Sequence, residues 1–349
     1  MTKETRLRAV SSIAGIGFLA ALASATTSCG QHDDWPPEQL ALTGSPRGAA
    51  TLELGRSVYE RDCIGCHGPS GDGQGPAAKF LSPKPRDFTK GIFKFAGVPA
   101  GDLPHDSDLL RTLRSGLHGT SMPVWELMPQ DEAVAVVQYL KTFSPRWLQR
   151  RPGPQIVPTE DPFAKRGDKG VELGRKVYHA VARCWGCHAA YESRAAIYDD
   201  GQSMGQTIAG FRDDLYTPEP KKSDWGDFIR PPDFTVDVLK AGDSLEDIYR
   251  DIASGIGGTA MPMWRGALSE DQLWGLAHYV KTLVELRGTP GAMALAQSLG
   301  TQPEFIPPPP PPEPAPPPLG SSSASSPSPQ PPSAPGPSTS APTPKPGTQ

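Results

Sequence analysis

The sequence predicts an all-α protein in which one helical domain occurs twice in tandem, between a signal-like N-terminus and a proline-rich C-terminal tail. Two observations support this fold class. An internal repeat fills the middle of the 349-residue chain, with its parts in the same order in both halves. Within each copy the apolar residues recur at helical spacing, and no long run alternates between apolar and polar residues as a half-buried strand would.

Four sequence blocks define the repeat. They are LELGRSVYERDCIGCH (52–67) with VELGRKVYHAVARCWGCH (171–188), PRDFT (85–89) with PPDFT (231–235), DLLRTLRSGLHGTSMPVW (108–125) with DIYRDIASGIGGTAMPMW (247–264), and VVQYLKTF (136–143) with LAHYVKTL (276–283). The repeat places one domain at residues 51–146 and the other at 168–288. The joining residues, 147–167, hold several prolines and charges of both signs, which is typical of a linker.

Each copy contains the signals of several helices. In the first copy, Val58 and Tyr59 belong to an apolar stripe that precedes the cysteines. A second helix is expected to be capped by Asp106 or Ser107, and a third to begin at Asp131. About 95 residues with so many loops form only a modest core, so we expect a few helices packed around a bound rigid group.

The N-terminus has the features of an export signal. A basic start precedes about 15 apolar residues, a run too short for a comfortable membrane span. Residues 1–29 are therefore predicted to be a signal peptide and residues 30–50 a polar tether. An A-x-A cleavage site lies at 23–25, while Cys29 lies in a context that resembles a bacterial lipobox. Thr26 stands where the lipobox has leucine, so lipid anchorage at Cys29 is only slightly favoured.

The C-terminal tail is predicted to span residues 289–349 and to be disordered from about residue 303. Proline occupies 19 of the last 43 positions, and most of the others are Ser, Ala, Thr and Gly. Such a segment buries too little apolar surface to offset the entropy cost of ordering it. The run Pro307–Pro312 favours polyproline II, which would suit a spacer or a docking arm, and an inert tail fits equally well.

The charge of the chain excludes one class of partner. The formal net charge is −4, and no basic stripe occurs that would bind nucleic acid. We therefore expect no nucleic-acid partner.

Apart from Cys29, all cysteines belong to C-x-x-C-H motifs. The two motifs are Cys63, Cys66 and His67 in the first copy, and Cys184, Cys187 and His188 in the second. Two thiols at this spacing reach the two vinyl groups of one haem, and the adjacent histidine then becomes the proximal iron ligand. Attachment outside the cytoplasm agrees with the export signal. The sequence predicts two covalent haems c.

Other uses of a C-x-x-C pair fit less well. A thioredoxin-like motif would follow a strand in a βαβ unit and needs no adjacent histidine. A structural zinc site needs four ligands around one metal, and an intact domain copy around each pair argues against a shared site. A disulfide within C-x-x-C would be exchangeable and would not serve as a staple.

Each half resembles a class I c-type cytochrome domain. The residues that carry the resemblance are Gly55, Tyr59, Cys63, Cys66, His67, the run GPSGDGQGP, Met122-Pro123 and Tyr139, with Gly174, Tyr178, Cys184, Cys187, His188, Met261-Pro262 and Tyr279 in the second copy. This resemblance covers about 220 residues and implies a helical fold around each haem. The second copy lacks the glycine-rich turn. It carries instead an insertion that is rich in Asp, Lys and Trp near 211–228, and we expect this insertion to form a lobe over a haem edge.

Met122 and Met261 are the expected distal iron ligands. Both lie in a GTxMPxW block, where glycines allow a sharp turn and proline fixes the loop. A thioether opposite histidine raises the haem potential. Met128, Met263 and His118 are competitors without a matching residue in the other copy. Arg86 of the PRDF block is a weaker candidate for a haem propionate partner, and helix capping is the alternative role of that block.

These features predict an electron carrier rather than an enzyme. Two irons with both axial positions filled would pass electrons between a redox donor and an acceptor on the periplasmic side, with a possible lipid anchor. A cytochrome subunit of a larger oxidoreductase complex is the alternative, as is a di-haem enzyme of peroxidase type, which needs an open iron.

Overall fold

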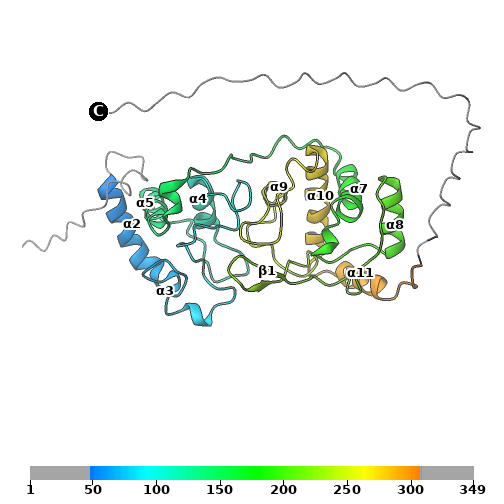
Figure 1. Ribbon diagram of the computed structural model, residues 1–349, viewed down its shortest axis with the longest axis horizontal. Coiled ribbons are helices and arrows are strands. Elements are labelled where there is room, and N and C mark those ends of the chain that lie inside the picture. Colours follow the sequence, from blue (N-terminus) through cyan, green and yellow to red (C-terminus); the bar gives the residue numbers. More distant parts are fainter. Residues whose placement is uncertain (1–47, 307, 309–349) are drawn as a thin grey trace, which may run out of the picture. The chain divides into compact units, whose positions relative to one another are not determined.

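The computed structural model describes residues 48–306 and 308 of the chain (Figure 1). Both copies of the repeat belong to one compact unit, which includes the described residues 48–305. The predicted signal peptide, Cys29, nearly all of the tether, and residues 307 and 309–349 of the tail lie outside the described residues.

The prediction of an all-α fold is confirmed. The first half contains α2 (Gly48–Asp62), α3 (Ile64–His67), η1 (Ala78–Phe80), α4 (Asp106–Ser115), α5 (Gln130–Lys141) and α6 (Arg146–Gln149). The second contains α7 (Gly167–Lys176), the π-helical turn η2 (Val177–Val181), η3 (Cys184–Gly186), α8 (Arg194–Ser203), α9 (Leu245–Ser254), α10 (Glu270–Leu286) and α11 (Pro290–Gly300). Its short strands β1 (Lys221–Lys222) and β2 (Phe228–Ile229) pair antiparallel.

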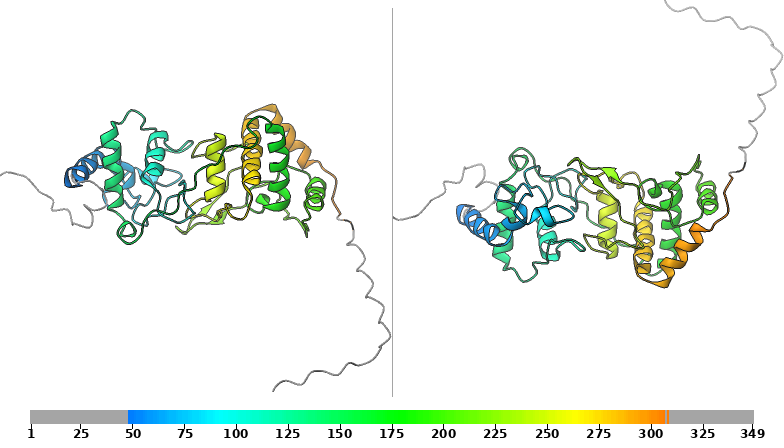
Figure 2. Two further views of the ribbon diagram at one scale, coloured as in Figure 1. Left: turned by 90° about the horizontal axis from the view of Figure 1, so that it is seen from above. Right: turned by 90° about the horizontal axis from the view of Figure 1, so that it is seen from below.

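In each half the first and last helices of the repeat cross at a glycine. Gly55 of α2 packs on the backbone of Ala135 in α5, and Gly174 of α7 packs on the backbone of Gly275 in α10. The helices of each pair lie side by side in both views of Figure 2. A Cβ atom at either glycine would collide with the facing carbonyl, so the crossing requires a residue without a side chain.

Two helix starts differ slightly from the expectation, and one of them is α5, which begins at Gln130, one residue before the predicted Asp131. The N-cap of α4 is His105, one residue before the predicted Asp106 or Ser107. The carboxylate of Asp108 accepts hydrogen bonds from the backbone N–H groups of His105 and Gly97. This longer-range bond explains the choice of cap, because it ties the helix start to a loop that local sequence patterns do not show.

The predicted linker is hydrogen-bonded to both halves. Its Ile156 N–H donates to the carbonyl of Gly97 at 2.7 Å. Further along, Asp161 contacts His278 of α10 at 2.9 Å. The linker therefore packs against both halves and is not a free spacer between them.

The described start of the tail packs on the second half. It begins with α11 and continues to Phe305, whose ring lies 5.5 Å from that of Tyr198 and 6.0 Å from that of Phe211. Gln302 accepts from the backbone N–H of Arg194. These contacts place the end of the packed region at Phe305, slightly beyond the predicted boundary near 303. Within the described residues, no helix combines the length and apolar character needed to span a membrane.

Candidate haem-binding sites

The first C-x-x-C-H motif opens into a cavity of about 450 Å³. Cys63 at the N-cap of the short helix α3 lines it, as do Cys66 and His67 within that helix, and Met122 and Trp125 also line it. The structure thus brings together the four first-copy residues that the sequence selected. Thiols, imidazole and thioether around an apolar cavity are the donor set that a covalently attached haem requires.

The cysteines are unsuited to redox catalysis by a C-x-x-C pair. All four cysteines of the two motifs are free and only partly exposed. Burial raises the pKa of Cys63 and of Cys184 to about 12. A catalytic thiol needs a lowered pKa. Within residues 48–306 and 308, no group of three or more His, Cys, Asp or Glu side chains gathers as a zinc site would require.

The two predicted proximal histidines have the same surroundings. Nδ1 of His67 donates to the carbonyl of Arg86 at 3.0 Å, and Nδ1 of His188 donates to the carbonyl of Pro232 at the same distance. A hydrogen bond at Nδ1 holds the neutral ring in the tautomer whose Nε2 carries a free lone pair for a metal. Because a backbone carbonyl accepts this bond, the side chain at that position is free to differ between the copies.

Each histidine ring also stacks on a phenylalanine of the same block. The centroid distance is 4.5 Å between His67 and Phe88, and 4.8 Å between His188 and Phe234. The PRDF and PPDF blocks therefore orient the histidines. The sequence suggested propionate binding or helix capping for these blocks, and this role differs from both. Sequence repetition marked these blocks, but only the fold shows what they contact.

The methionine loops are also built alike. In the first copy the Thr120 hydroxyl accepts from the Met122 N–H at 3.1 Å, and the carbonyl of Met122 accepts from Leu117 N–H at 3.1 Å. In the second, Thr259 and Ile256 make the same two bonds with Met261, both at 3.2 Å. The threonine of GTxMPxW thus closes the turn that aims the methionine inward.

The competing residues lie elsewhere. Met128 is buried in the core beneath α5, with 8% of its surface exposed, and it does not line the cavity. Met263 is 41% exposed. His118 is exposed, and its backbone N–H donates to the carbonyl of Lys240. These positions favour Met122 and Met261 over the alternatives.

In the first copy the glycine-rich turn covers the carbonyls of the C-x-x-C-H helix. Gly73 N–H donates to His67 at 2.9 Å and Gly75 N–H donates to Cys66 at 3.1 Å. A Cβ atom at Gly75 would collide with the backbone of Gly65. The glycines are needed because the chain passes so close to the motif.

In the second copy a side chain from the insertion performs this task. The guanidinium of Arg212 donates to the carbonyls of Trp185 and His188, at 2.8 and 2.9 Å. Glu219 N–H donates to the carbonyl of Cys187 at 2.8 Å. The insertion thus replaces the missing glycine turn. Arg212 was not predicted, and no local motif distinguishes it from the other arginines of the chain.

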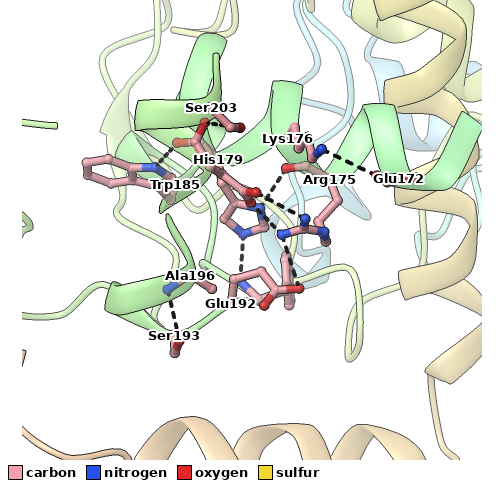
Figure 3. Close-up of polar contacts among 11 residues, drawn as sticks. Glu172, Arg175, Lys176, His179, Trp185, Glu192, Ser193, Ala196 and Ser203 are labelled. Carbon is pink, nitrogen blue, oxygen red and sulfur yellow. Dashed lines mark hydrogen bonds and ion pairs between the residues drawn. The ribbon is translucent and has the colours of Figure 1, made fainter. Parts of the chain in front are cut away.

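The second copy has two extra residues before its motif, and the wider π-helical turn η2 accommodates them. This π-helical turn is followed by Arg183, which has a positive φ of 50°. His179 lies inside the turn: its Nδ1 donates to the carbonyl of Arg175, and its Nε2 accepts from the N–H of Tyr191. Its own carbonyl accepts from the indole of Trp185 (Figure 3). Burial lowers the pKa of His179 to about 3, so the ring is neutral and serves as a structural link.

Comparisons with known proteins agree with this geometry. The family model described as "Cytochrome C oxidase, cbb3-type, subunit III" matches residues 50–140 and again 170–280. Among solved structures, one chain of the Kuenenia stuttgartiensis reducing HAO-like protein complex is similar, with 33% identity and a TM-score of 0.54 over 66% of this chain and 96% of that one. No curated protein gives a significant match. The matches account for both repeats and both motifs, so the chain belongs to the family of cbb3-type cytochrome c oxidase subunit III and is a c-type cytochrome with two haem-binding domains that serve electron transfer.

Proposed function

We propose that this protein carries electrons through two covalently bound haems c, each with histidine and methionine as axial ligands. The cysteine pairs Cys63/Cys66 and Cys184/Cys187 would form the thioether bonds. His67 with Met122, and His188 with Met261, would hold the two irons. A bound haem supplies one-electron oxidation and reduction at its iron.

The residues of the chain tune and protect this chemistry. The carbonyls of Arg86 and Pro232 keep Nε2 of the two histidines available to the metal. The turn-closing threonines hold each methionine in place, and a thioether ligand favours the reduced iron. The repeated methionine loop is the observation that carries the proposal, because two filled axial positions suit electron transfer and leave no site for substrate.

Removal of either methionine tests the ligand assignment. In Met122→Ala or Met261→Ala, the charge-transfer band of methionine-ligated ferric haem should be halved, and one midpoint potential should fall by something on the order of 0.1 V, within the range of about 0.8 V that axial ligands control. Optical redox titration measures both. Met263→Ala, an exposed neighbour, is the control and should change neither.

The outcome that contradicts the proposal is equally clear. A haem assay that finds fewer than two covalent haems per chain would refute the double attachment. A wild-type spectrum dominated by high-spin iron, with rapid turnover of hydrogen peroxide, would support the peroxidase-type alternative instead.

A second candidate function is that of a cytochrome subunit in a larger oxidoreductase. The observation in its favour is that the similar solved chain belongs to a complex. Affinity purification of the full chain from its native membrane or periplasmic fraction should then recover a partner enzyme in constant ratio. Recovery of a monodisperse free monomer would favour the independent carrier.

Export and anchorage complete the proposal. The basic and apolar start of the chain would direct it to the periplasmic side, where c-type haem is attached, and Cys29 would carry a lipid if the lipobox is used. Redox proteins on that side would be the donor and the acceptor. Mass spectrometry of the mature N-terminus distinguishes cleavage at 23–25 from lipidation at Cys29.

A further inference from the structure

The haem cavity of the first half is not built by that half alone. Its lining includes Lys240, which belongs to the second half, beside Arg86 and Lys94 of the first. Two backbone bonds hold the lysines there: His118 N–H donates to the carbonyl of Lys240 at 2.9 Å, and Gly257 N–H donates to the carbonyl of Lys94 at 3.1 Å. Three cations therefore meet at one edge of the cavity, where the two halves touch.

These cations lack acidic partners. Among the described residues, no carboxylate oxygen lies within ion-pair distance of Arg86, Lys94 or Lys240. Burial, with the charges of Arg86 and Lys240, lowers the pKa of Lys94 to about 8. Partly buried like charges without a counter-ion are costly, so the cluster is suited to an anion that arrives with a ligand.

Trp225, from the insertion of the second half, completes the cluster. The guanidinium of Arg86 lies 3.9 Å from the centroid of its ring, and the Lys94 ammonium lies 5.6 Å from it. The edge of the ring also packs against Gly258, where a side chain would collide with it. The indole Nε1 is buried and has no hydrogen-bond partner in the described protein. Trp225 does not line the cavity, so it acts by holding the guanidinium of Arg86, which does.

We propose that the second domain completes the haem site of the first: Lys240, together with Arg86 and Lys94, binds the propionate carboxylates of the first haem. This inference rests on the proposed function, since it assumes a haem at His67. The two carboxylates of a haem supply the anion that the cations lack, while the Trp225 ring holds the guanidinium of Arg86. The insertion thus acts on the first haem and not only on its own.

One consequence concerns the reduction potential of the first haem. A positive side chain beside the propionates favours the reduced iron, because it offsets their negative charge. Residues of the second domain would therefore set the potential of the first haem, and docking of the two domains would be linked to haem binding in the first.

The test compares potentials in the full-length holoprotein. In Lys240→Gln the midpoint potential of the first haem should fall, whereas that of the second should stay unchanged. Met122→His identifies which titration wave belongs to the first haem. Lys222→Gln removes an exposed lysine of the same domain and is the matched control, expected to shift neither wave.

A second variant reports on the contact itself. Trp225→Leu removes the ring on which Arg86 stacks without changing a residue that lines the cavity, and it should shift the propionate bending bands in the resonance Raman spectrum. Unchanged bands in Trp225→Leu, together with an unchanged first-haem potential in Lys240→Gln, would overturn the inference. A potential that depends on inorganic phosphate at constant ionic strength would also overturn it, because the cluster would then bind a free anion.

The proposed function and this inference fail in different ways. If the wild-type protein lacks two covalent haems or the methionine signature, the proposed function is wrong. If both are present but the variants behave as wild type, the electron carrier stands and only the cross-domain propionate site is wrong.

Discussion

The backbone carbonyls of the two C-x-x-C-H motifs are covered by different kinds of residue. In the first copy the backbone of a glycine turn covers the helix carbonyls, whereas in the second copy Arg212 reaches from the insertion to do so. A guanidinium suits this task because its fixed fork offers several N–H donors at once. The same function is thus performed by residues that do not align in the repeat.

Removal of Arg212 should specifically weaken the second domain. Arg212→Ala leaves the carbonyls of Trp185 and His188 without their donor, and we expect the free energy of unfolding to fall by about 2 kcal/mol. Arg212→Lys should rescue little, because an ammonium cannot span both carbonyls. Urea unfolding measures the loss. Arg230→Ala, at an exposed ion pair, is the control; an equal loss there would contradict a special role for Arg212.

His179 should make stability depend on pH. Its pKa of about 3 in the folded protein lies below the 6.5 of an exposed histidine, so the unfolded chain binds the proton first. Its contribution is fully present above about pH 6.5 and is lost as the pH falls toward 3, by about 1.4 kcal/mol per pH unit.

The variant His179→Gln isolates this effect. Compared with wild type, the free energy of unfolding of His179→Gln should fall less steeply between pH 6.5 and pH 4.5 in urea titrations. His118→Gln, at an exposed ring, should retain the wild-type slope. Parallel curves for wild type and His179→Gln would show that the ring does not titrate in this way.

At the scale of helices, each domain depends on one close crossing. The pairs α2 with α5 and α7 with α10 approach so closely that a glycine on the first helix faces a backbone carbonyl on the second. Tyr59 with Tyr139, and Tyr178 with Tyr279, then pack beside the crossing, each pair with ring centroids 5.5 Å apart. The crossing holds the start of the C-x-x-C-H motif against the last helix of the domain.

A methyl group at this crossing should be harmful even though alanine favours helices. In Gly174→Ala the new Cβ meets the carbonyl of Gly275. We expect a net loss of about 1–2 kcal/mol, since overpacking outweighs the gain in helix propensity of at most about 1 kcal/mol. Thermal unfolding measures it. Gly300→Ala, at the end of α11 with open space around it, should not destabilise the protein.

At the scale of the whole unit, the two halves share contacts through the methionine loop of the second. Gly257 packs on the carbonyl of Phe93, and its N–H donates to that of Lys94. Ala100 N–H donates to the carbonyl of Ser254 at 2.9 Å. The linker also forms hydrogen bonds to both halves, so the two domains pack together rather than being joined only by a flexible linker.

Substitution at Gly257 should loosen this assembly without removing either haem. In Gly257→Ala the added methyl meets the Phe93 carbonyl, so the halves should separate, and trypsin should cut the linker after Arg150 faster. Limited proteolysis and small-angle scattering measure the change. Gly210→Ala, which has open space, is the control. An unchanged cleavage rate would mean that the interface accommodates the methyl group without separation of the halves.

The sequence by itself determined the repeat, the helical class and the residues placed around the first cavity. Cys63, Cys66 and His67 are close because they share one helical turn, and Met122 was found because its loop recurs with the same turn-forming residues. These are local patterns, and covalent geometry and turn chemistry constrain them strongly. Duplication then separated such patterns from chance.

Only the tertiary structure decided what lies opposite those residues. Arg212, Lys240 and Trp225 act on groups that are distant in sequence, and nothing local marks them. The role of the PRDF block also changed, because its backbone carbonyl and its phenylalanine contact the histidine, whereas its arginine faces the other domain. Every residue type has a backbone carbonyl, and any arginine side chain can donate to one. The sequence therefore does not identify these hydrogen-bond partners, and only the fold of the chain brings them together.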